Sequence, residues 1–161
     1  LMEFLSREVP RMVEQGISMR VLGDLESMPL AQRTALRHAI KRTEGGKDMI
    51  LNLALNYGGR GEIVRAMQNM LREGLRPEDV TEQAVADHLY TVGQPDPDLL
   101  VRTSGEQRLS NYLLYQCAYS ELYFTPVPWP DFDAAQLRMA LDAYAARSRR
   151  FGKTQEQIDA H

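Results

Sequence analysis

The sequence predicts an α/β fold, a parallel sheet covered by helices. Two observations support this prediction: short apolar runs that suit strands alternate with longer amphipathic stretches that suit helices, and the alternation continues along most of the chain. The 161 residues suffice for one domain with a substantial core, and 43% hydrophobic with 25% charged residues is usual for a folded, water-soluble protein. We therefore expect a single domain over residues 1–161.

The spacing of apolar residues predicts each element in order. Apolar residues three and four positions apart indicate a helix, and short alternating or continuous apolar runs indicate a strand. The first half is thereby predicted to form, in order, a helix at 1–15, a strand at 17–22, a helix at 30–43, a strand at 49–55, a helix around 63–71 and a short helix from Thr81 to about Leu89. Pro10 should kink or split the first helix. Gly45-Gly46 should stop the second helix and Gly74 the third. Almost every residue of 49–55 is apolar, which suits a strand buried on both faces.

The second half continues the alternation with shorter elements. It is predicted to form strands at 99–101 and 122–124, a helical turn at 113–118 and a last helix at 133–150. Asp133 and Gln136 resemble a capping box at the start of that helix, and Gly152 can close it. Ligands of parallel sheets bind beyond the carboxyl ends of the strands. Two stretches lie at such ends, 56–60 and 102–111, and both are candidates for the same pocket.

The stretch that begins at Arg102 contains the residue types of an anion site. Arg102 and Arg108 carry planar guanidinium groups, whose fixed donors suit phosphate oxygens. Ser110 and Asn111 can donate hydrogen bonds to the same anion or cap the helical turn that follows. The alternative is that both arginines pair with carboxylates of the chain, such as Glu106. The residues alone leave both interpretations open.

Glu121 is a lone carboxylate at the start of a predicted strand. Magnesium prefers oxygen ligands and often takes one or two carboxylates together with substrate phosphate, so Glu121 could complete a site for magnesium and phosphate. By itself, a solvated acid is the simpler interpretation. The stretch from Asn56 to Gly59 is interpreted as turn chemistry, with Glu62 favouring the following helix start through the helix dipole.

Several classes of function are disfavoured by composition and spacing. The net charge of −3 offers no general attraction for nucleic acid. His38, His88 and His161 are scattered, so a zinc site is not expected. Cys117 is the single cysteine and lacks a neighbouring base, which fits a core residue in a reducing cytoplasm. No stretch is long and apolar enough to span a bilayer, and the first residues do not form a signal peptide.

Three blocks of sequence resemble the cis-prenyltransferase family, most of all its bacterial undecaprenyl diphosphate synthase branch. They are RTSGEQRLSNYLLYQCAYSELYFTPVPWPDF at 102–132, LNLALNYGGRGEIVRA at 51–66 and RRFG at 149–152. The resemblance implies a parallel-sheet fold and a magnesium-dependent homodimer that condenses isopentenyl diphosphate onto an allylic diphosphate, such as farnesyl diphosphate, with Z stereochemistry. The implied product is a polyprenyl diphosphate, a lipid carrier for cell-wall glycan synthesis.

The resemblance also implies roles for single residues and a place in the cell. Arg102, Arg108, Leu109 and Ser110 are expected to bind the diphosphate of isopentenyl diphosphate. Glu121 is expected to bind magnesium. The enzyme is expected in the cytoplasm, at the periphery of the membrane to which its product is delivered, without a nucleic-acid partner.

Two family blocks have no counterpart in this sequence. One is an Asp-Gly-Asn-Gly-Arg loop, whose essential aspartate binds the allylic diphosphate, and the other is a later Ser-x-x-Asn-Trp block. The chain therefore resembles the C-terminal portion of a cis-prenyltransferase catalytic domain without its N-terminal strand and phosphate loop. We expect it to contain no catalytic residue, to be inactive alone, and to associate or be unstable. The alternative is a non-catalytic partner subunit, which the joint presence of Arg102, Arg108, Ser110 and Glu121 disfavours.

Overall fold

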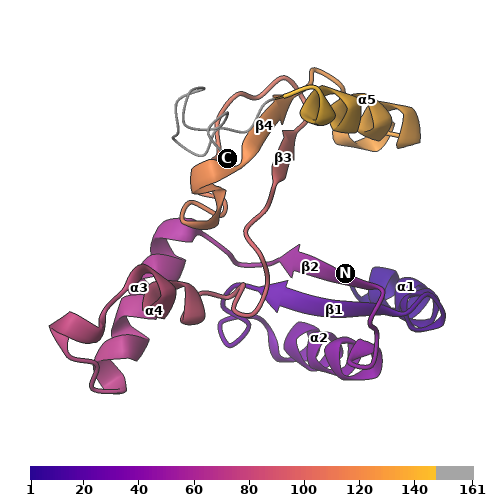
Figure 1. Ribbon diagram of the computed structural model, residues 1–161. Coiled ribbons are helices and arrows are strands. Elements are labelled where there is room, and N and C mark those ends of the chain that lie inside the picture. Colours follow the sequence, from indigo (N-terminus) through magenta and orange to yellow (C-terminus); the bar gives the residue numbers. More distant parts are fainter. Residues whose placement is uncertain (148–161) are drawn as a thin grey trace. The chain divides into compact units, whose positions relative to one another are not determined.

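The computed structural model describes residues 1–147. The chain divides into two compact units, Leu1–Gln94 and the residues from Pro95 onward, and each unit contains a two-stranded parallel sheet with helices (Figure 1). The predicted α/β architecture with parallel strands is therefore confirmed. The single domain over residues 1–161 stays a prediction. The RRFG block at 149–152, which includes the expected helix stop at Gly152, lies outside the described residues.

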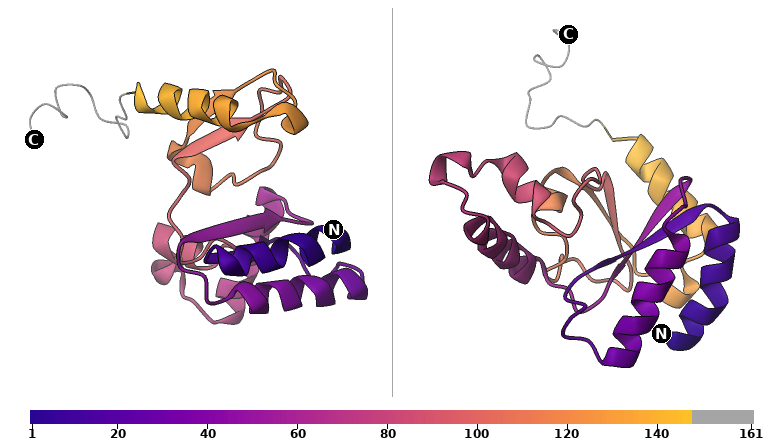
Figure 2. Two further views of the ribbon diagram at one scale, coloured as in Figure 1. Left: turned by 90° about the vertical axis from the view of Figure 1, so that its right-hand side faces the viewer. Right: turned by 90° about the horizontal axis from the view of Figure 1, so that it is seen from below.

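The first unit follows the predicted order of elements. It contains α1 (Met2–Glu14), β1 (Ile17–Leu22), α2 (Leu30–Thr43), β2 (Met49–Ala54), α3 (Gly59–Arg72), a short 3-10 helix (Pro77–Asp79) and α4 (Glu82–Asp87). β1 and β2 pair in parallel, in a register that sets Ile17 opposite Met49 and Leu22 opposite Ala54. α1 and α2 lie side by side and both contact β1 (Figure 2).

The core of the first unit lies between β1 and these two helices. Apolar side chains from all three elements form one buried cluster, made of Leu5, Val9, Met12, Met19, Leu36 and Ala39. Leu36 is 0% exposed, and complete burial of such a leucine contributes about 2 kcal/mol to stability. The cluster members of α1 are spaced by three and four residues, so the predicted helical period and the buried face agree.

One local expectation for the first unit is wrong and another is answered in part. Of the kink or split expected at Pro10, the split does not occur and the kink stays a prediction. Pro10 does not split α1, because Val9 and Met12 on either side of it are buried in the core and hold the helix together across the lost hydrogen bond. β2 is not buried on both faces: Met49 and Ile50 are 49% and 42% exposed. The reason is that α1 and α2 pack against β1, whereas the main contacts of β2 among the described elements are with β1 itself.

The second unit is built around β3 (Leu99–Arg102) and β4 (Glu121–Phe124). A 3-10 helix (Gln116–Tyr119) comes between the two strands, and a 3-10 helix (Trp129–Asp131) and α5 (Ala134–Ala145) follow them. β3 and β4 pair in parallel, with Leu99 opposite Glu121. Asp133 caps α5 as predicted, because its carboxylate accepts a hydrogen bond from the backbone N–H of Gln136 at 2.9 Å.

Two element boundaries in the second unit differ from the prediction. The helical turn predicted at 113–118 forms at Gln116–Tyr119, because Leu113 has a left-handed backbone conformation (φ 42°) that a right-handed helix cannot include. α5 ends at Ala145, short of the predicted residue 150. The chain turns there, since the N–H of Arg147 bonds to the carbonyl of Tyr144 at 3.0 Å and its guanidinium reaches back to β4.

A histidine forms a polar contact between the end of α3 and the end of α4. His88, directly after α4, lies with Nε2 3.0 Å from a carboxylate oxygen of Glu73 and with Nδ1 2.6 Å from the carbonyl oxygen of Ala84. Hydrogen bonding to Glu73, and then to Ala84, raises the pKa of His88 above its ordinary value, and the charge of Asp87 acts in the same direction.

We expect the stabilisation that His88 provides to decrease as the pH rises. A histidine whose pKa is raised on folding stabilises the fold fully below its unfolded pKa of about 6.5, and this contribution is lost as the pH rises through the higher folded pKa. Urea unfolding of the wild type and Glu73→Gln should therefore show a larger difference at about pH 5.5 than at about pH 8.5. Equal differences at both pH values would contradict the expectation.

Candidate anion-binding site

Backbone hydrogen bonds fix the loop after β3 to the chain that follows β4. The N–H of Thr125 donates to the carbonyl of Arg102, and the N–H groups of Ser104 and Gly105 donate to the carbonyls of Val127 and Thr125, each at 2.9 Å. Ser104 and Gly105 have positive φ angles of 66° and 74°, so the chain turns sharply after the strand. The residues that follow this turn therefore stay near the carboxyl end of β3.

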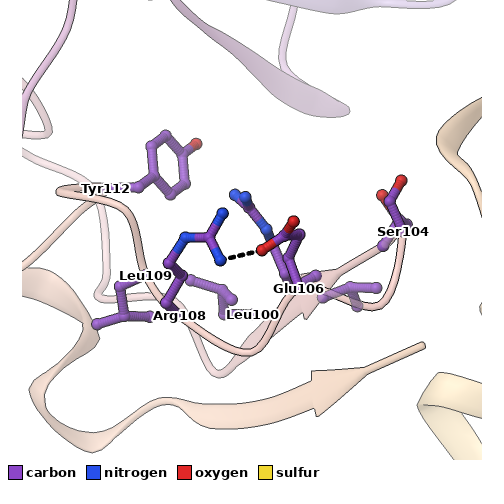
Figure 3. Close-up of a pocket in the computed structure, with 9 residues that line it drawn as sticks. Leu100, Ser104, Glu106, Arg108, Leu109 and Tyr112 are labelled. Carbon is purple, nitrogen blue, oxygen red and sulfur yellow. Dashed lines mark ion pairs between the residues drawn. The ribbon is translucent and has the colours of Figure 1, made fainter. Parts of the chain in front are cut away.

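An open cavity of about 400 Å³ lies at this end of β3 (Figure 3). It is lined by Leu100, Val101, Arg102, Thr103, Ser104, Glu106, Arg108, Leu109 and Tyr112. Three of the four residues expected to bind diphosphate, Arg102, Arg108 and Leu109, thus line one cavity. Apolar walls with a few polar groups, at the carboxyl end of parallel strands, are typical of a ligand site.

Two guanidinium groups and one carboxylate provide the charges of the cavity. Arg108 forms an ion pair with Glu106, and their side chains point toward each other (Figure 3). Arg102 is partly buried and has no ion-pair partner within residues 1–147. Burial raises the pKa of Tyr112, so its hydroxyl stays protonated at neutral pH and can donate a hydrogen bond. The lining therefore carries a net positive charge, which favours an anion.

Ser110 is the expected binding residue that does not line this cavity. It is exposed, and it and Asn111 have left-handed backbone conformations with φ angles of 51° and 63°. The helix start that was expected to add backbone donors lies farther along the chain, at Gln116. A role for Ser110 in substrate binding stays a prediction.

Glu121 lies at the start of β4. It is opposite Leu99, whereas Arg102, which lines the cavity, lies about 10 Å farther along β3. Glu121 itself is not among the lining residues, although Leu100, the neighbour of Leu99, is one of them. Nη1 of Arg147 donates a hydrogen bond to the Glu121 carboxylate at 2.7 Å, and Nη2 donates to the carbonyl of Leu122 at 3.0 Å. The Glu121 carboxylate at the start of β4 thus bonds to Arg147, just after the end of α5.

The structure does not place Glu121 among the residues that line the cavity with Arg102 and Arg108. Magnesium held by one carboxylate takes further ligands from substrate phosphate, which requires the carboxylate and the phosphate at one place. The guanidinium of Arg147 also balances the charge of Glu121. Across residues 1–147, no three His, Cys, Asp or Glu side chains gather so as to hold a metal ion. Magnesium binding by Glu121 stays a prediction.

The glycine-containing stretch 56–62 lies in the first unit and contributes to a buried polar contact. Glu62, in the first turn of α3, is 2% exposed and accepts hydrogen bonds from the Tyr57 hydroxyl at 2.5 Å and the Tyr90 N–H at 2.7 Å. The guanidinium of Arg65 lies 3.8 Å from the centre of the Tyr90 ring. Sequence analysis linked Glu62 to the helix dipole and missed this contact. The single pocket expected from this stretch and 102–111 stays a prediction.

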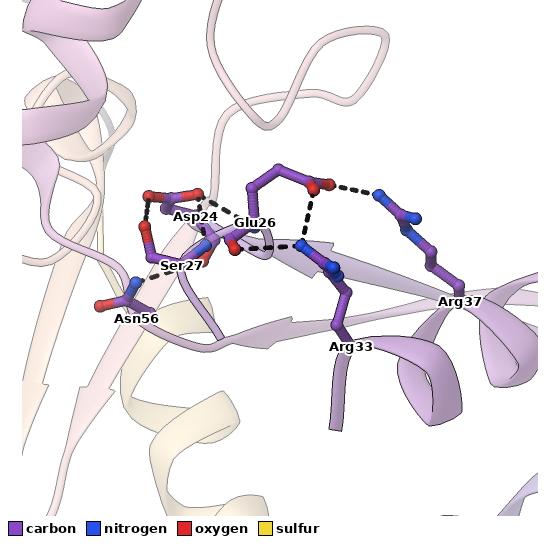
Figure 4. Close-up of polar contacts among 6 residues, drawn as sticks. All are labelled: Asp24, Glu26, Ser27, Arg33, Arg37 and Asn56. Atoms are coloured by element: carbon purple, nitrogen blue, oxygen red, sulfur yellow. Dashed lines mark hydrogen bonds and ion pairs between the residues drawn. The ribbon is translucent and has the colours of Figure 1, made fainter. Parts of the chain in front are cut away.

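The turn after β1 holds a second group of polar contacts (Figure 4). The Asp24 carboxylate accepts hydrogen bonds from the Ser27 hydroxyl and from the N–H groups of Ser27 and Glu26. The bond from the Ser27 hydroxyl, with the two backbone bonds, holds the pKa of Asp24 below its ordinary value. The Asn56 side chain donates to the Asp24 carbonyl at 3.1 Å, and Glu26 pairs with Arg33 at 3.0 Å. These groups satisfy one another, so we interpret them as stabilising the turn.

Two further expectations concern Cys117 and the membrane. Cys117 is buried, and burial raises the pKa of its thiol, in agreement with its interpretation as a core residue. None of the helices among residues 1–147 has the length and hydropathy needed to cross a bilayer.

Comparison with known proteins gives a consistent result. The undecaprenyl diphosphate synthase family model (Prenyltransf) matches residues 1–152. An isoprenyl transferase of Streptococcus agalactiae serotype III (strain NEM316) is 47% identical over 158 residues, which cover 93% of this chain and 63% of the relative. An isoprenyl transferase of Clostridium perfringens (strain 13 / Type A) is 42% identical over 156 residues, which cover 94% of this chain and 62% of the relative. The chain thus spans less than two thirds of the length of these curated relatives.

A solved structure matches in fold as well as in sequence. The crystal structure of lavandulyl diphosphate synthase from Lavandula x intermedia, in complex with dimethylallyl diphosphate, has a TM-score of 0.89 and 39% sequence identity. The match covers 94% of this chain and 68% of that protein.

Proposed function

The chain belongs to the undecaprenyl diphosphate synthase family, and we propose that the complete protein is a prenyltransferase. It condenses isopentenyl diphosphate onto an allylic diphosphate, such as farnesyl diphosphate, with Z stereochemistry. The product is a polyprenyl diphosphate that serves as a lipid carrier for cell-wall glycan synthesis. The names of the relatives support prenyl transfer, and the dimethylallyl diphosphate of the solved relative supports an allylic diphosphate as substrate.

The cavity at the carboxyl end of β3 is the observation that carries this proposal. Arg102 and Arg108 both line it, and each guanidinium can offer paired donors to phosphate oxygens. The apolar side chains beside them suit the short hydrocarbon part of isopentenyl diphosphate. A substrate held there by its diphosphate has a fixed orientation toward the second substrate, which makes the condensation effectively intramolecular.

The proposal has four further parts. They are magnesium dependence, a homodimer, a cytoplasmic location and delivery of the product to the membrane. They rest on the resemblance to the family. Because Glu121 is not among the residues that line the cavity, no step of the proposal runs through magnesium. In this proposal the residues of the chain bind and orient one diphosphate substrate, and the catalytic aspartate comes from the upstream sequence.

Labelled isopentenyl diphosphate tests the proposal. The upstream part of the coding sequence is restored, and the label is followed into extracted lipid with farnesyl diphosphate and magnesium present. The restored chain is expected to incorporate label, and the 161-residue chain alone is expected to incorporate none. Synthesis by the chain alone would overturn the assignment of the catalytic aspartate to the upstream sequence. A restored and folded chain that incorporates nothing would favour the alternative of a non-catalytic partner subunit.

A further inference from the structure

His88 lies with both of its ring nitrogens next to oxygen acceptors. Nδ1 is 2.6 Å from the carbonyl oxygen of Ala84, and Nε2 is 3.0 Å from a carboxylate oxygen of Glu73. A neutral imidazole has one N–H group and one nitrogen lone pair, whereas an imidazolium has two N–H groups. Only the imidazolium can therefore donate to both oxygens, because in either neutral tautomer a lone pair faces one of them.

The two bonds of the ring connect α4 to the end of α3, beside which it lies (Figure 1). Ala84 belongs to α4, and Glu73 directly follows α3. None of the six residues of α4 is buried, and the first buried residue after it is Leu89, at 3% exposure. The attachment of α4 therefore depends on polar contacts, among them the two bonds of the His88 ring.

The chain that follows His88 is attached by contacts that do not depend on the ring. The guanidinium of Arg65 donates to the backbone carbonyl of His88 at 2.7 Å, and the N–H of Tyr90 donates to the Glu62 carboxylate at 2.7 Å. Both contacts can stay in place when the ring loses its proton. Opening can therefore be confined to α4, while the rest of the first unit keeps its fold.

Charged groups of both helices act on the ring. Glu73 from the end of α3 and Asp87 from the end of α4 favour the imidazolium, whereas the Arg65 guanidinium from α3 and the burial of the ring oppose it. Hydrogen bonding to Glu73, and then to Ala84, outweighs this opposition, so the pKa of His88 is raised. The ring thus keeps its proton to a higher pH than an isolated histidine, whose pKa is about 6.5.

We propose that His88 is a pH-dependent latch, which attaches α4 to the end of α3 while its ring is protonated and releases α4 when the ring becomes neutral. With one N–H lost, one of the two bonds breaks, and the nitrogen lone pair repels the oxygen that it faces. The pH of the surroundings thereby controls a local conformational change in the first unit. The inference does not depend on the proposed function.

Hydrogen exchange of backbone amides tests the latch. In the 161-residue chain, NMR follows the N–H groups of Val85, His88 and Leu89, which bond to carbonyls of residues 81–86. Their protection, relative to an unstructured peptide at the same pH, should fall about two- to tenfold between about pH 5.5 and 8.5, as the loss of one hydrogen bond predicts. The amides of α2, which packs in the core, should stay better protected at both pH values, because α4 opens without unfolding of the core.

Three variants assign the effect to His88. His88→Gln has no ring proton to lose, so its α4 amides should show the lower protection at both pH values. Glu73→Gln keeps an acceptor oxygen but removes the charge that favours the imidazolium, so the midpoint of the change should move to lower pH. His38→Gln is the matched control: His38 is an exposed histidine of α2, and this variant should keep the wild-type pH dependence.

Each outcome supports or overturns the latch. In the wild type, the midpoint of the change should coincide with the NMR titration of the His88 ring. Equal protection of α4 at both pH values in the wild type, or a pH dependence that persists in His88→Gln, would overturn the proposal. If His88→Gln does not fold, the Glu73→Gln midpoint decides: a lower midpoint supports the latch, and an unchanged one overturns it.

Discussion

Replacement of Arg102 by alanine is expected to weaken the binding of inorganic diphosphate about ten- to a hundredfold. Arg102 ends β3, is partly buried and lines the cavity, so its guanidinium lies where an anion in the cavity would bind. A charge-assisted hydrogen bond contributes about 1.5–3 kcal/mol, which corresponds to a loss of this size. Calorimetric titration of the 161-residue chain measures the dissociation constant directly.

Two further variants make the Arg102 result specific. Arg138→Ala removes the same charge from an exposed position on α5 outside the cavity, and its affinity should stay within about twofold of the wild type. Arg102→Lys keeps the charge but loses the planar fork of donors, so it should bind with intermediate affinity. Wild-type affinity of Arg102→Ala would show that this cavity is not where diphosphate binds.

Replacement of Glu62 by alanine is expected to lower the free energy of unfolding by about 3 kcal/mol. The Glu62 side chain is buried, and its loss leaves the Tyr57 hydroxyl and the Tyr90 N–H without this acceptor. A buried donor without an acceptor costs about 1–3 kcal/mol, and the removed side chain leaves a cavity as well. Urea unfolding at neutral pH measures the change.

Glu78→Ala is the control for the Glu62 substitution. Glu78 is an exposed glutamate of the same unit that forms an ion pair with Arg76 at 3.3 Å, and its loss should change stability by less than about 0.5 kcal/mol. Glu62→Gln keeps an acceptor oxygen and should be intermediate. If the alanine variants at the two positions were equally stable, the buried contact of Glu62 would contribute nothing.

The longer elements of the fold could be predicted because their apolar residues repeat regularly. β1 at Ile17–Leu22 and α2 at Leu30–Thr43 have the bounds that the spacing predicts. The errors arise at single residues whose conformation or contacts leave no periodic signal. The helical turn begins at Gln116 and not at Leu113, because Leu113 has a positive φ. α5 is shorter than predicted, and Arg147, which follows it, bonds to Glu121 of β4.

The candidate site could be predicted in part. Arg102 and Arg108 were predicted to bind an anion because they follow a predicted strand. In the structure both residues line the same cavity. The place of Glu121 depends on the register of β3 and β4, which the sequence alone does not specify. Glu62 was missed because carboxylates are seldom buried, although its spacing of four residues from the buried Ala66 is a signal of the same helix face.

Each unit contains one two-stranded sheet, so within its own unit every strand has one paired side and one open side. An edge strand presents a row of backbone N–H and C=O groups that no adjacent strand pairs, and this row is a template for a further strand. Parallel sheets with so few strands are seldom stable in water, because their faces and open sides normally need cover. Each unit, taken by itself, therefore has open strand sides at which a further strand can pair, from another segment of protein or from another copy.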